Sequence, residues 1–175
     1  MYMSGKLMVV ANLVIGSDGS TSKNGRSIGL SSQADRARFH EIRSKSNAIL
    51  IGGETARREP YKKTPVPLFI VTHSHVRLQP KNQLAKQLNM DPIAAISEIE
   101  KFFEGKNDVQ LLVESGPKLL QLLIDNKKIN KLFLTINHAM TGENKIDIEN
   151  LLKNFNLTSR EKIDSDEFCL YELAN

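Results

Sequence analysis

The decisive stretch is Leu111–Leu122, which reads LLVESGPKLLQL. An apolar run stops at Glu114, and the tripeptide Ser115–Pro117 follows it. Serine can cap a helix, glycine permits any backbone angle, and proline suits the first helical position because it lacks only an N–H that would be unpaired there. The stretch therefore predicts a buried strand, a tight turn and a helix over Lys118–Asn126.

A helix start of this kind can bind an anion, because its unpaired N–H groups and the helix dipole both favour negative charge. The same residues also serve simply to turn the chain in many α/β proteins, and the twelve residues alone favour that second interpretation. Glu114 favours a ligand site over a simple turn, because a carboxylate beside an anion site needs a partner rich in hydrogen-bond donors. The turn is therefore a candidate for contact with a substrate that carries N–H groups as well as a phosphate.

Length and composition indicate an ordinary globular chain. Its 175 residues fit one domain, 1–175, with a sizeable core, and 40% apolar and 25% charged residues are typical values. The sequence has no apolar run of about 18 residues, so no membrane span is expected. The first apolar segment leads into a polar loop without a small-residue cleavage site, which predicts a cytoplasmic protein.

The charge balance is mildly basic, with 24 Lys and Arg against 20 Asp and Glu, a net charge of +4 and a pI near 9.2. The cations are scattered and no aromatic residues interleave with them, so phosphorylated small molecules are better partners than nucleic acid. The single cysteine, Cys169, excludes a disulfide framework and a Cys-rich zinc site and is expected in the core. His73 and His75 lack a third ligand nearby, so no metal site is predicted.

Apolar runs and caps predict alternating strands and helices along the chain. Between the second and third strands, residues 55–67 are expected to form a mobile loop, and residues 73–90 to hold a short helix. The loop after the first strand does not match a nucleotide-binding P-loop, because five residues separate Gly19 from Gly25 and Arg26 replaces the lysine. The predicted strands are Leu7–Ile15, Ala48–Ile51, Leu68–Thr72, Val109–Val113, Lys131–Asn137 and Phe168–Leu173, and the predicted helices run from Ser31 or Ser32 to Ser44 and from Asp91 to Phe103.

Two features inside these strands allow two interpretations each. Asn12 interrupts the first apolar run, and a buried amide contacts either a ligand or the neighbouring backbone. Gly52 and Gly53 follow the second strand, where the backbone must either approach something closely or take a positive φ. The close neighbour can be a cofactor or another loop.

Alternating strands and helices predict an α/β fold, a three-layer sandwich with a mostly parallel central sheet. Ligands bind at the carboxyl ends of such strands. Three predicted strand ends, in residues 12–18, 52–55 and 114–117, are expected to converge on one cleft.

Three segments taken together resemble the riboflavin-pathway pyrimidine reductases, the carboxyl-terminal domain family of bifunctional deaminase-reductases. They read ANLVIGSDGS, HEIRSKSNAILIGGET and LLVESGPKLLQLLIDNKKINKLFLTINHAMTG, and the resemblance covers nearly the whole chain. It implies a dihydrofolate-reductase-like fold and an NADPH-dependent oxidoreductase. Family members transfer hydride to the ribosyl C1 of a phosphoribosylamino-pyrimidine, which becomes a ribitylamino group, and they form homodimers.

The resemblance also implies roles for individual residues. It places Ser27, Arg43, Glu114 and Lys62 at the substrate, and Asn12 and Asp18 near the reacting centre, with Asp18 as suited to fixing the loop as to touching ligand. Arginine can pair bidentately with a phosphate, and a carboxylate can accept from pyrimidine N–H groups. The implied NADPH contacts are Val14, Gly29, Gly52, Gly53, Thr55, Gly116, Pro117, Lys118, Leu119 and Leu120.

The sequence departs from the family pattern at several points. Relatives usually carry T-V-x-x-D-[DN]-P after the second strand, whereas this chain has the shorter TARREP with Glu59 as its acid. This departure leaves two alternatives open, a reductase of a pterin or another small carbonyl or imine compound, and a nucleotide-binding module without catalysis. One cysteine cannot supply the zinc site of the deaminase, so no deaminase domain is expected within these residues.

Overall fold

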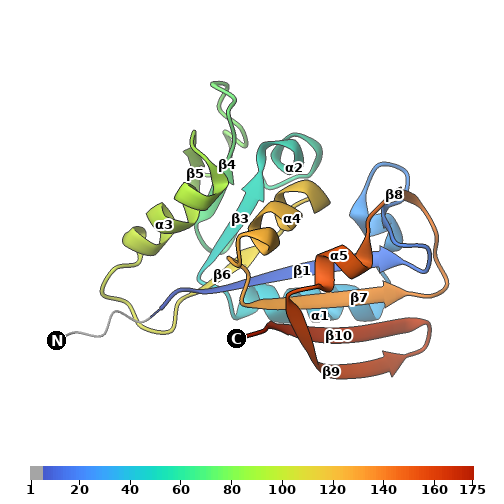
Figure 1. The fold of residues 1–175 in the computed structure, drawn as a ribbon. Coiled ribbons are helices and arrows are strands. Elements are labelled where there is room, and N and C mark those ends of the chain that lie inside the picture. The colour runs from blue at the N-terminus through green and yellow to red at the C-terminus, as the bar shows by residue number, and fades with distance from the viewer. Residues whose placement is uncertain (1–5) are drawn as a thin grey trace. The chain divides into compact units, whose positions relative to one another are not determined.

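The computed structural model describes residues 6–175, so the start of the amino-terminal segment considered for a cleavage signal, residues 1–5, lies outside the described residues. The chain divides into two compact units. The first unit comprises the chain up to Val9 together with Lys45–Lys128, and the second comprises Val10–Ser44 together with Ile129–Asn175. Figure 1 shows their elements.

Parallel strands form the first unit. They lie in the order β5-β4-β3-β6, and Leu50 of β3 is paired with Val113 of β6 and with Phe69 of β4. Apolar side chains fill both faces of β3, where Ile49, Leu50 and Ile51 are all 0% exposed, as expected for a parallel strand covered on both sides. The elements are β3 (Ala48–Gly52), α2 (Gly53–Arg58), β4 (Leu68–Val71), β5 (Ala85–Leu88), α3 (Pro92–Phe102), β6 (Gln110–Val113) and α4 (Pro117–Asp125).

The second unit mixes parallel and antiparallel pairs. Its strands lie in the order β1-β7-β10-β9, with β1 parallel to β7 and with β10 antiparallel to both β7 and β9. A small antiparallel pair, β2 with β8, accompanies them. The elements are β1 (Met8–Gly16), β2 (Ser20–Ser22), the 3-10 helix η1 (Ser27–Leu30), α1 (Gln33–Ser44), β7 (Lys131–Asn137), β8 (Glu143–Lys145), α5 (Ile148–Leu152), β9 (Phe155–Ile163) and β10 (Asp166–Leu173).

The strongly patterned elements are confirmed. The Ser32 hydroxyl accepts from the Asp35 N–H at 2.9 Å at the start of α1, and Asp91 accepts from the Ile93 N–H at 2.8 Å at the start of α3. Cys169 is 0% exposed, as expected of a small core residue. Strands β1, β3, β4, β6, β7 and β10 lie within one or two residues of their predicted ranges.

Two local expectations are wrong. Residues 53–58 form α2, where a loop was expected from residue 55 onward, and residues 85–88 form strand β5, where a short helix was expected. Helix α5 was not foreseen. Ser115 does not cap α4, because the N-cap residue is Gly116 and the Ser115 hydroxyl donates to the Gly116 carbonyl at 3.2 Å.

Contacts distant in sequence explain these two corrections. The Gln79 amide donates to the carbonyls of Ala56 and Glu59 at the end of α2, 23 and 20 residues away, and a local ion pair between Arg58 and Glu54 at 2.9 Å lies within the helix. None of the residues of strand β5 is fully buried, so its sequence shows little pattern, and its pairing with β4 decides its conformation.

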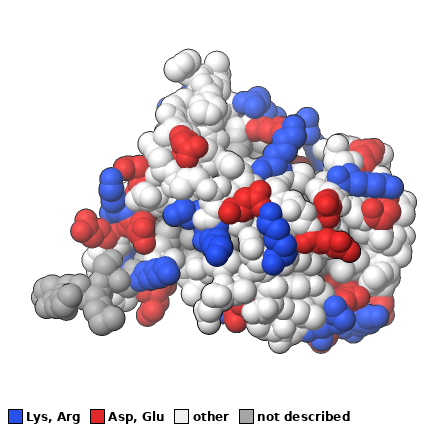
Figure 2. Space-filling model, viewed as in Figure 1, with Lys and Arg blue, Asp and Glu red and all other residues white. Residues whose placement is uncertain are grey.

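The α/β class with mostly parallel strands is confirmed, whereas the single-domain expectation remains a prediction. Among the described residues, the helices are too short and too polar for any of them to cross a bilayer. Lys and Arg side chains are intermingled with Asp and Glu over the face shown in Figure 2.

Candidate functional site

Two neighbouring strand ends form the candidate site of the first unit. Strands β3 and β6 are parallel neighbours, and the Glu114 N–H continues their ladder by donating to the Leu50 carbonyl at 3.0 Å. Each strand leads into a helix, α2 after β3 and α4 after β6. Residues 52–55 and 114–117 therefore lie at the same edge, as expected of carboxyl ends of parallel strands.

The double glycine after β3 is explained by close packing. Gly52 has φ −85° and caps α2, and Gly53 is its first residue, so neither serves a left-handed turn. A Cβ on Gly53 would lie 2.5 Å from Thr72 Oγ1, and one on Gly52 would lie 3.3 Å from Leu119 Cδ2. Both glycines therefore lie close to side chains of the protein itself. Their contact with a cofactor remains a prediction.

The start of α4 has the features of an anion site. Gly116 is the N-cap with φ −65° and ψ 169°, Pro117 follows it, and no side chain among the described residues caps the helix. A Cβ built on Gly116 would meet no described heavy atom within 4 Å. The first turn thus offers main-chain N–H groups beside open space, which fits a pyrophosphate group.

The other α4 residues assigned to the cofactor differ in exposure. Lys118 is exposed, and Pro117 and Leu119 are half-buried. Leu120 is 1% exposed, and its N–H donates to the Gly116 carbonyl at 3.2 Å.

Glu114 is held in a buried position at this edge. Glu114 is 9% exposed, and its Oε2 accepts a hydrogen bond from the Tyr61 hydroxyl at 2.6 Å. Sequence reasoning missed Tyr61, because 53 residues separate the two and no local pattern links them. The sequence signal was limited to an aromatic residue within an otherwise polar segment.

The remaining first-unit candidates lie on α2 and after it. Thr55 is half-buried, and its carbonyl accepts from the Glu59 N–H at 2.9 Å. Lys62 is exposed, next to Tyr61.

Asn12 lies within β1 of the second unit, where it is paired with Phe133 of β7. Its Oδ1 atom is buried and has no hydrogen-bond partner among the described residues. Buried amide oxygens are nearly always paired, so this atom needs a partner such as a ligand or a water molecule.

Asp18 is engaged within its own loop. Its Oδ1 accepts from the Ser20 N–H at 3.2 Å, and its Oδ2 lies 3.3 Å from Lys145 Nζ. Hydrogen bonding from Ser20, with a further contribution from Lys145, lowers the pKa of the Asp18 carboxyl to about 2. These contacts support the loop-fixing interpretation of Asp18.

The other second-unit candidates occupy β1, η1 and α1. Val14 is 7% exposed, whereas Ser27 is exposed. A Cβ on Gly29 would lie 2.7 Å from the Lys23 carbonyl oxygen, so Gly29 is packed closely against the main chain of the protein itself. The Arg43 guanidinium lies over the Phe39 ring, 5.0 Å from its centroid. Convergence of these residues with the β3 and β6 ends remains a prediction.

Three solved structures illustrate the likeness of the fold. A bifunctional diaminohydroxyphosphoribosylaminopyrimidine deaminase/5-amino-6-(5-phosphoribosylamino)uracil reductase from Thermotoga maritima is 15% identical, with a TM-score of 0.71 over 95% of this chain and 56% of that one. A pyrimidine reductase-like protein from Corynebacterium diphtheriae is 14% identical, with a TM-score of 0.71 over 96% and 92% of the two chains. Dihydrofolate reductase from Enterococcus faecalis, complexed with NADP(H) and RAB-propyl, is 15% identical, with a TM-score of 0.65 over 99% and 100% of the two chains.

These likenesses confirm the dihydrofolate-reductase-like fold. The chain spans slightly more than half the length of the bifunctional Thermotoga protein. No curated protein matches the chain by sequence.

The model of the RibD C-terminal domain family matches residues 8–168. The chain therefore belongs to the RibD C-terminal domain family.

Proposed function

We propose that this chain is an NADPH-dependent pyrimidine reductase of riboflavin biosynthesis. It transfers hydride to the ribosyl C1 of a phosphoribosylamino-pyrimidine, and the product is the ribitylamino compound. The observation that carries the proposal is the first-unit edge, where the buried carboxylate Glu114 follows β6 and an uncapped helix start beside open space comes directly after it. The family match over residues 8–168 supports the same assignment.

The chain's own groups fit NADPH at the start of α4. Main-chain N–H groups of Lys118 and Leu119 belong to the uncapped first turn, and the space at Gly116 accommodates a phosphate close to the backbone. A carboxylate at that point would repel phosphate, so the neutral Gly116 suits the role. NADPH supplies the hydride when bound, and the protein supplies binding and orientation.

The substrate groups follow from the same chemistry. Glu114 is assigned to N–H groups of the pyrimidine, because a carboxylate accepts such bonds strongly. Arg43, Ser27 and Lys62 are assigned to the phosphoribosyl part, where a cation pairs with phosphate. Hydride addition at C1 opens the sugar ring, so the ring oxygen takes up one proton, and Asn12 is assigned to this reacting centre.

A direct spectrophotometric assay of NADPH oxidation by the purified chain tests the proposal. NADPH absorbance is followed with the phosphoribosylamino-pyrimidine, with dihydrofolate as a pterin substrate, and with neither. We expect oxidation only with the pyrimidine, and a pyrimidine KM raised at least about tenfold in Glu114→Gln, since a hydrogen bond to a charged group contributes about 1.5–3 kcal/mol.

The alternatives make different predictions in this assay. Oxidation with dihydrofolate but not with the pyrimidine would replace the proposal by a pterin reductase. NADPH binding without turnover of either compound would identify a nucleotide-binding module. The homodimer and the cytoplasmic location expected from the sequence remain predictions.

A further inference from the structure

The hydrogen bond from Tyr61 to Glu114 is short and sheltered. Tyr61 Oη lies 2.6 Å from Glu114 Oε2, and both residues are 9% exposed. A hydroxyl that donates to a carboxylate forms one of the stronger hydrogen bonds in proteins, and burial strengthens it further. Because the Glu114 N–H also donates to Leu50, the residue is fixed both at its main chain and at its carboxylate.

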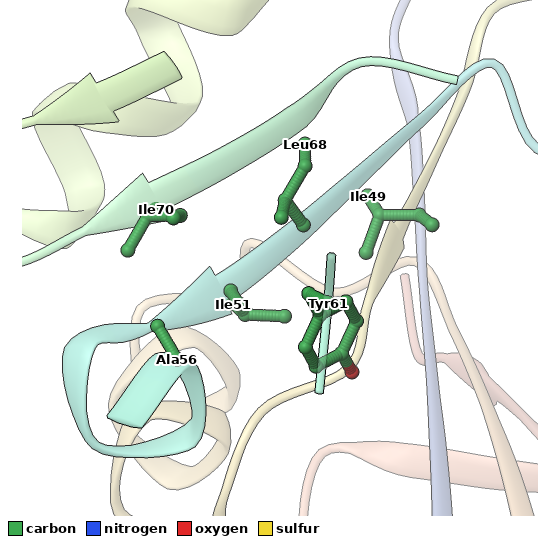
Figure 3. Packing of buried hydrophobic residues seen from close by; sticks show 6 residues of the cluster. All are labelled: Ile49, Ile51, Ala56, Tyr61, Leu68 and Ile70. Atoms are coloured by element: carbon green, nitrogen blue, oxygen red, sulfur yellow. The ribbon is translucent and has the colours of Figure 1, made fainter. Parts of the chain in front are cut away.

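Tyr61 is itself fixed by its ring. The ring belongs to an apolar cluster that includes Ile49, Ile51 and Leu68, and each of these three side chains is 0% exposed. In Figure 3 the ring lies beside Ile49 and Ile51, and its oxygen points away from Leu68. A ring packed in this way has few rotamers open to it, so the direction of the hydroxyl is set by the core.

A buried amide holds the main chain that carries Tyr61. Asn82 is 2% exposed, and its Nδ2 donates to the Tyr61 carbonyl at 2.9 Å and to Thr64 Oγ1 at 3.0 Å. Its Oδ1 accepts from the Leu84 N–H at 2.9 Å. Thr64 in turn donates to the Val66 carbonyl at 2.9 Å. Both amide hydrogens and the amide oxygen of Asn82 are thus used to shape this segment.

The segment that carries Asn82 also holds the start of the loop between α2 and β4, in which Tyr61 lies. Gln79 Nε2 donates to the carbonyls of Ala56 and Glu59, at 2.6 and 2.9 Å, where α2 ends. The segment expected from the sequence to be a mobile loop is therefore held by Gln79 at its start, by Asn82 in its middle and by the Tyr61 ring in the core.

We propose that Tyr61 is a positioning residue, whose hydroxyl fixes the orientation of the Glu114 carboxylate that receives the pyrimidine N–H groups. The inference rests on the proposed function for the identity of that ligand. The short segment after α2 thereby acts on substrate binding through Tyr61, because it sets the plane in which Glu114 accepts hydrogen bonds.

Removing only the Tyr61 hydroxyl separates its positioning of Glu114 from the structural role of its ring. Tyr61→Phe keeps the ring in the core and removes the hydroxyl. We expect it to raise the pyrimidine KM about tenfold, since a lost charge-assisted bond costs at least that much, while kcat and the NADPH dissociation constant change less than about twofold. Tyr171→Phe, on β10 of the second unit, is the matched control and should leave all three constants unchanged.

A double-mutant cycle tests whether Tyr61 acts through Glu114. In the Glu114→Gln background, adding Tyr61→Phe should raise the pyrimidine dissociation constant less than about twofold, because the group that Tyr61 positions is already altered. Equal effects of Tyr61→Phe in both backgrounds would overturn the inference, and so would an unchanged KM in Tyr61→Phe.

Urea denaturation of the same four proteins provides a readout that needs no ligand. If the pair is coupled, the shifts in the denaturation midpoint of the single variants will not add in the double variant. Additive shifts overturn the inference, whatever the activity. Non-additive shifts in a protein that binds neither NADPH nor pyrimidine overturn the proposed function and the substrate part of the inference, while the pair itself stands.

Discussion

His138 Nε2 lies 3.0 Å from Oε2 of Glu167, where β7 ends and β10 begins. The hydrogen bond from His138 lowers the pKa of the Glu167 carboxyl, and Arg160, whose Nε lies 2.9 Å from Oε1, lowers it further. A carboxyl with a lowered folded-state pKa stabilises the protein above its unfolded-state pKa, and this stability is lost as the pH falls through the folded value.

His138→Ala should therefore raise the pKa of Glu167 and destabilise the protein at neutral pH. The two stability curves should converge at acidic pH, because a protonated Glu167 gains little from His138 in either protein. Urea unfolding at a series of pH values measures the curves, with the exposed His75→Ala as control. A constant difference between the curves down to the most acidic pH would contradict the pairing.

Lys145→Met should raise the pKa of Asp18 above its value of about 2, because hydrogen bonding at Ser20, the main cause of that lowering, remains, whereas the Lys145 ammonium 3.3 Å from Oδ2 is lost. The contribution of Asp18 to stability is present above its unfolded pKa of about 3.9 and is lost as the pH falls toward about 2. A carboxyl-carbon NMR titration measures the pKa in both proteins. An identical titration in Lys145→Met would show that Lys145 does not help to hold the carboxylate.

Gly116→Asp should weaken NADPH binding at least roughly tenfold, because a carboxylate beside a phosphate costs one to several kcal/mol. Gly116→Ala is the uncharged control, since a Cβ there meets no described atom within 4 Å, and it should weaken NADPH binding less than the aspartate variant because it adds no charge beside the phosphate. Equilibrium fluorescence titration measures both. Equal affinities of the aspartate and alanine variants would remove the cofactor phosphates from the start of α4.

Gly53→Ala should destabilise the first unit by about 1–3 kcal/mol, the usual cost of overpacking. Its Cβ would lie 2.5 Å from Thr72 Oγ1 and 2.9 Å from Thr72 Cβ, so α2 or β4 must move. Gly116→Ala, at φ −65°, should be neutral or slightly stabilising in the same urea experiment. If both variants unfold at the same urea concentration, the close packing of Gly53 on Thr72 is contradicted.

Arg38→Met should destabilise the chain by about 2 kcal/mol, since it removes cation–π contacts and a hydrogen bond from a partly sheltered guanidinium. Arg38 lies 5.3 and 5.0 Å from the ring centroids of Phe133 and Phe168 and donates to the Cys169 carbonyl at 3.0 Å. Arg58→Met removes an exposed ion pair with Glu54 and should shift the unfolding free energy by at most about 0.5 kcal/mol. Equal losses in the two variants would show that Arg38 contributes no more than a surface arginine.

Local pattern predicted the fold where a segment's own residues decide its conformation. The apolar runs of β3 and β6 are 0–1% exposed, apart from their end residues, and the caps Ser32 and Asp91 lie within a few residues of the N–H groups they serve. The pattern failed at β5, because an edge strand of this unit with half-exposed side chains carries no clear periodicity. It also failed at α2, because the glutamine that caps this helix lies 20 or more residues away.

The sequence by itself determined the α/β class and the strand-turn-helix of residues 111–122, because apolar runs and the backbone preferences of glycine and proline act locally, and its motifs indicated the family. Only the tertiary structure decided that Gly53 packs on Thr72, that Asp18 is bound within its loop and that Tyr61 holds Glu114. The physical reason is that a hydrogen bond or a steric contact depends on distances of a few ångströms. Such distances between residues far apart in the chain exist only after the strands have paired.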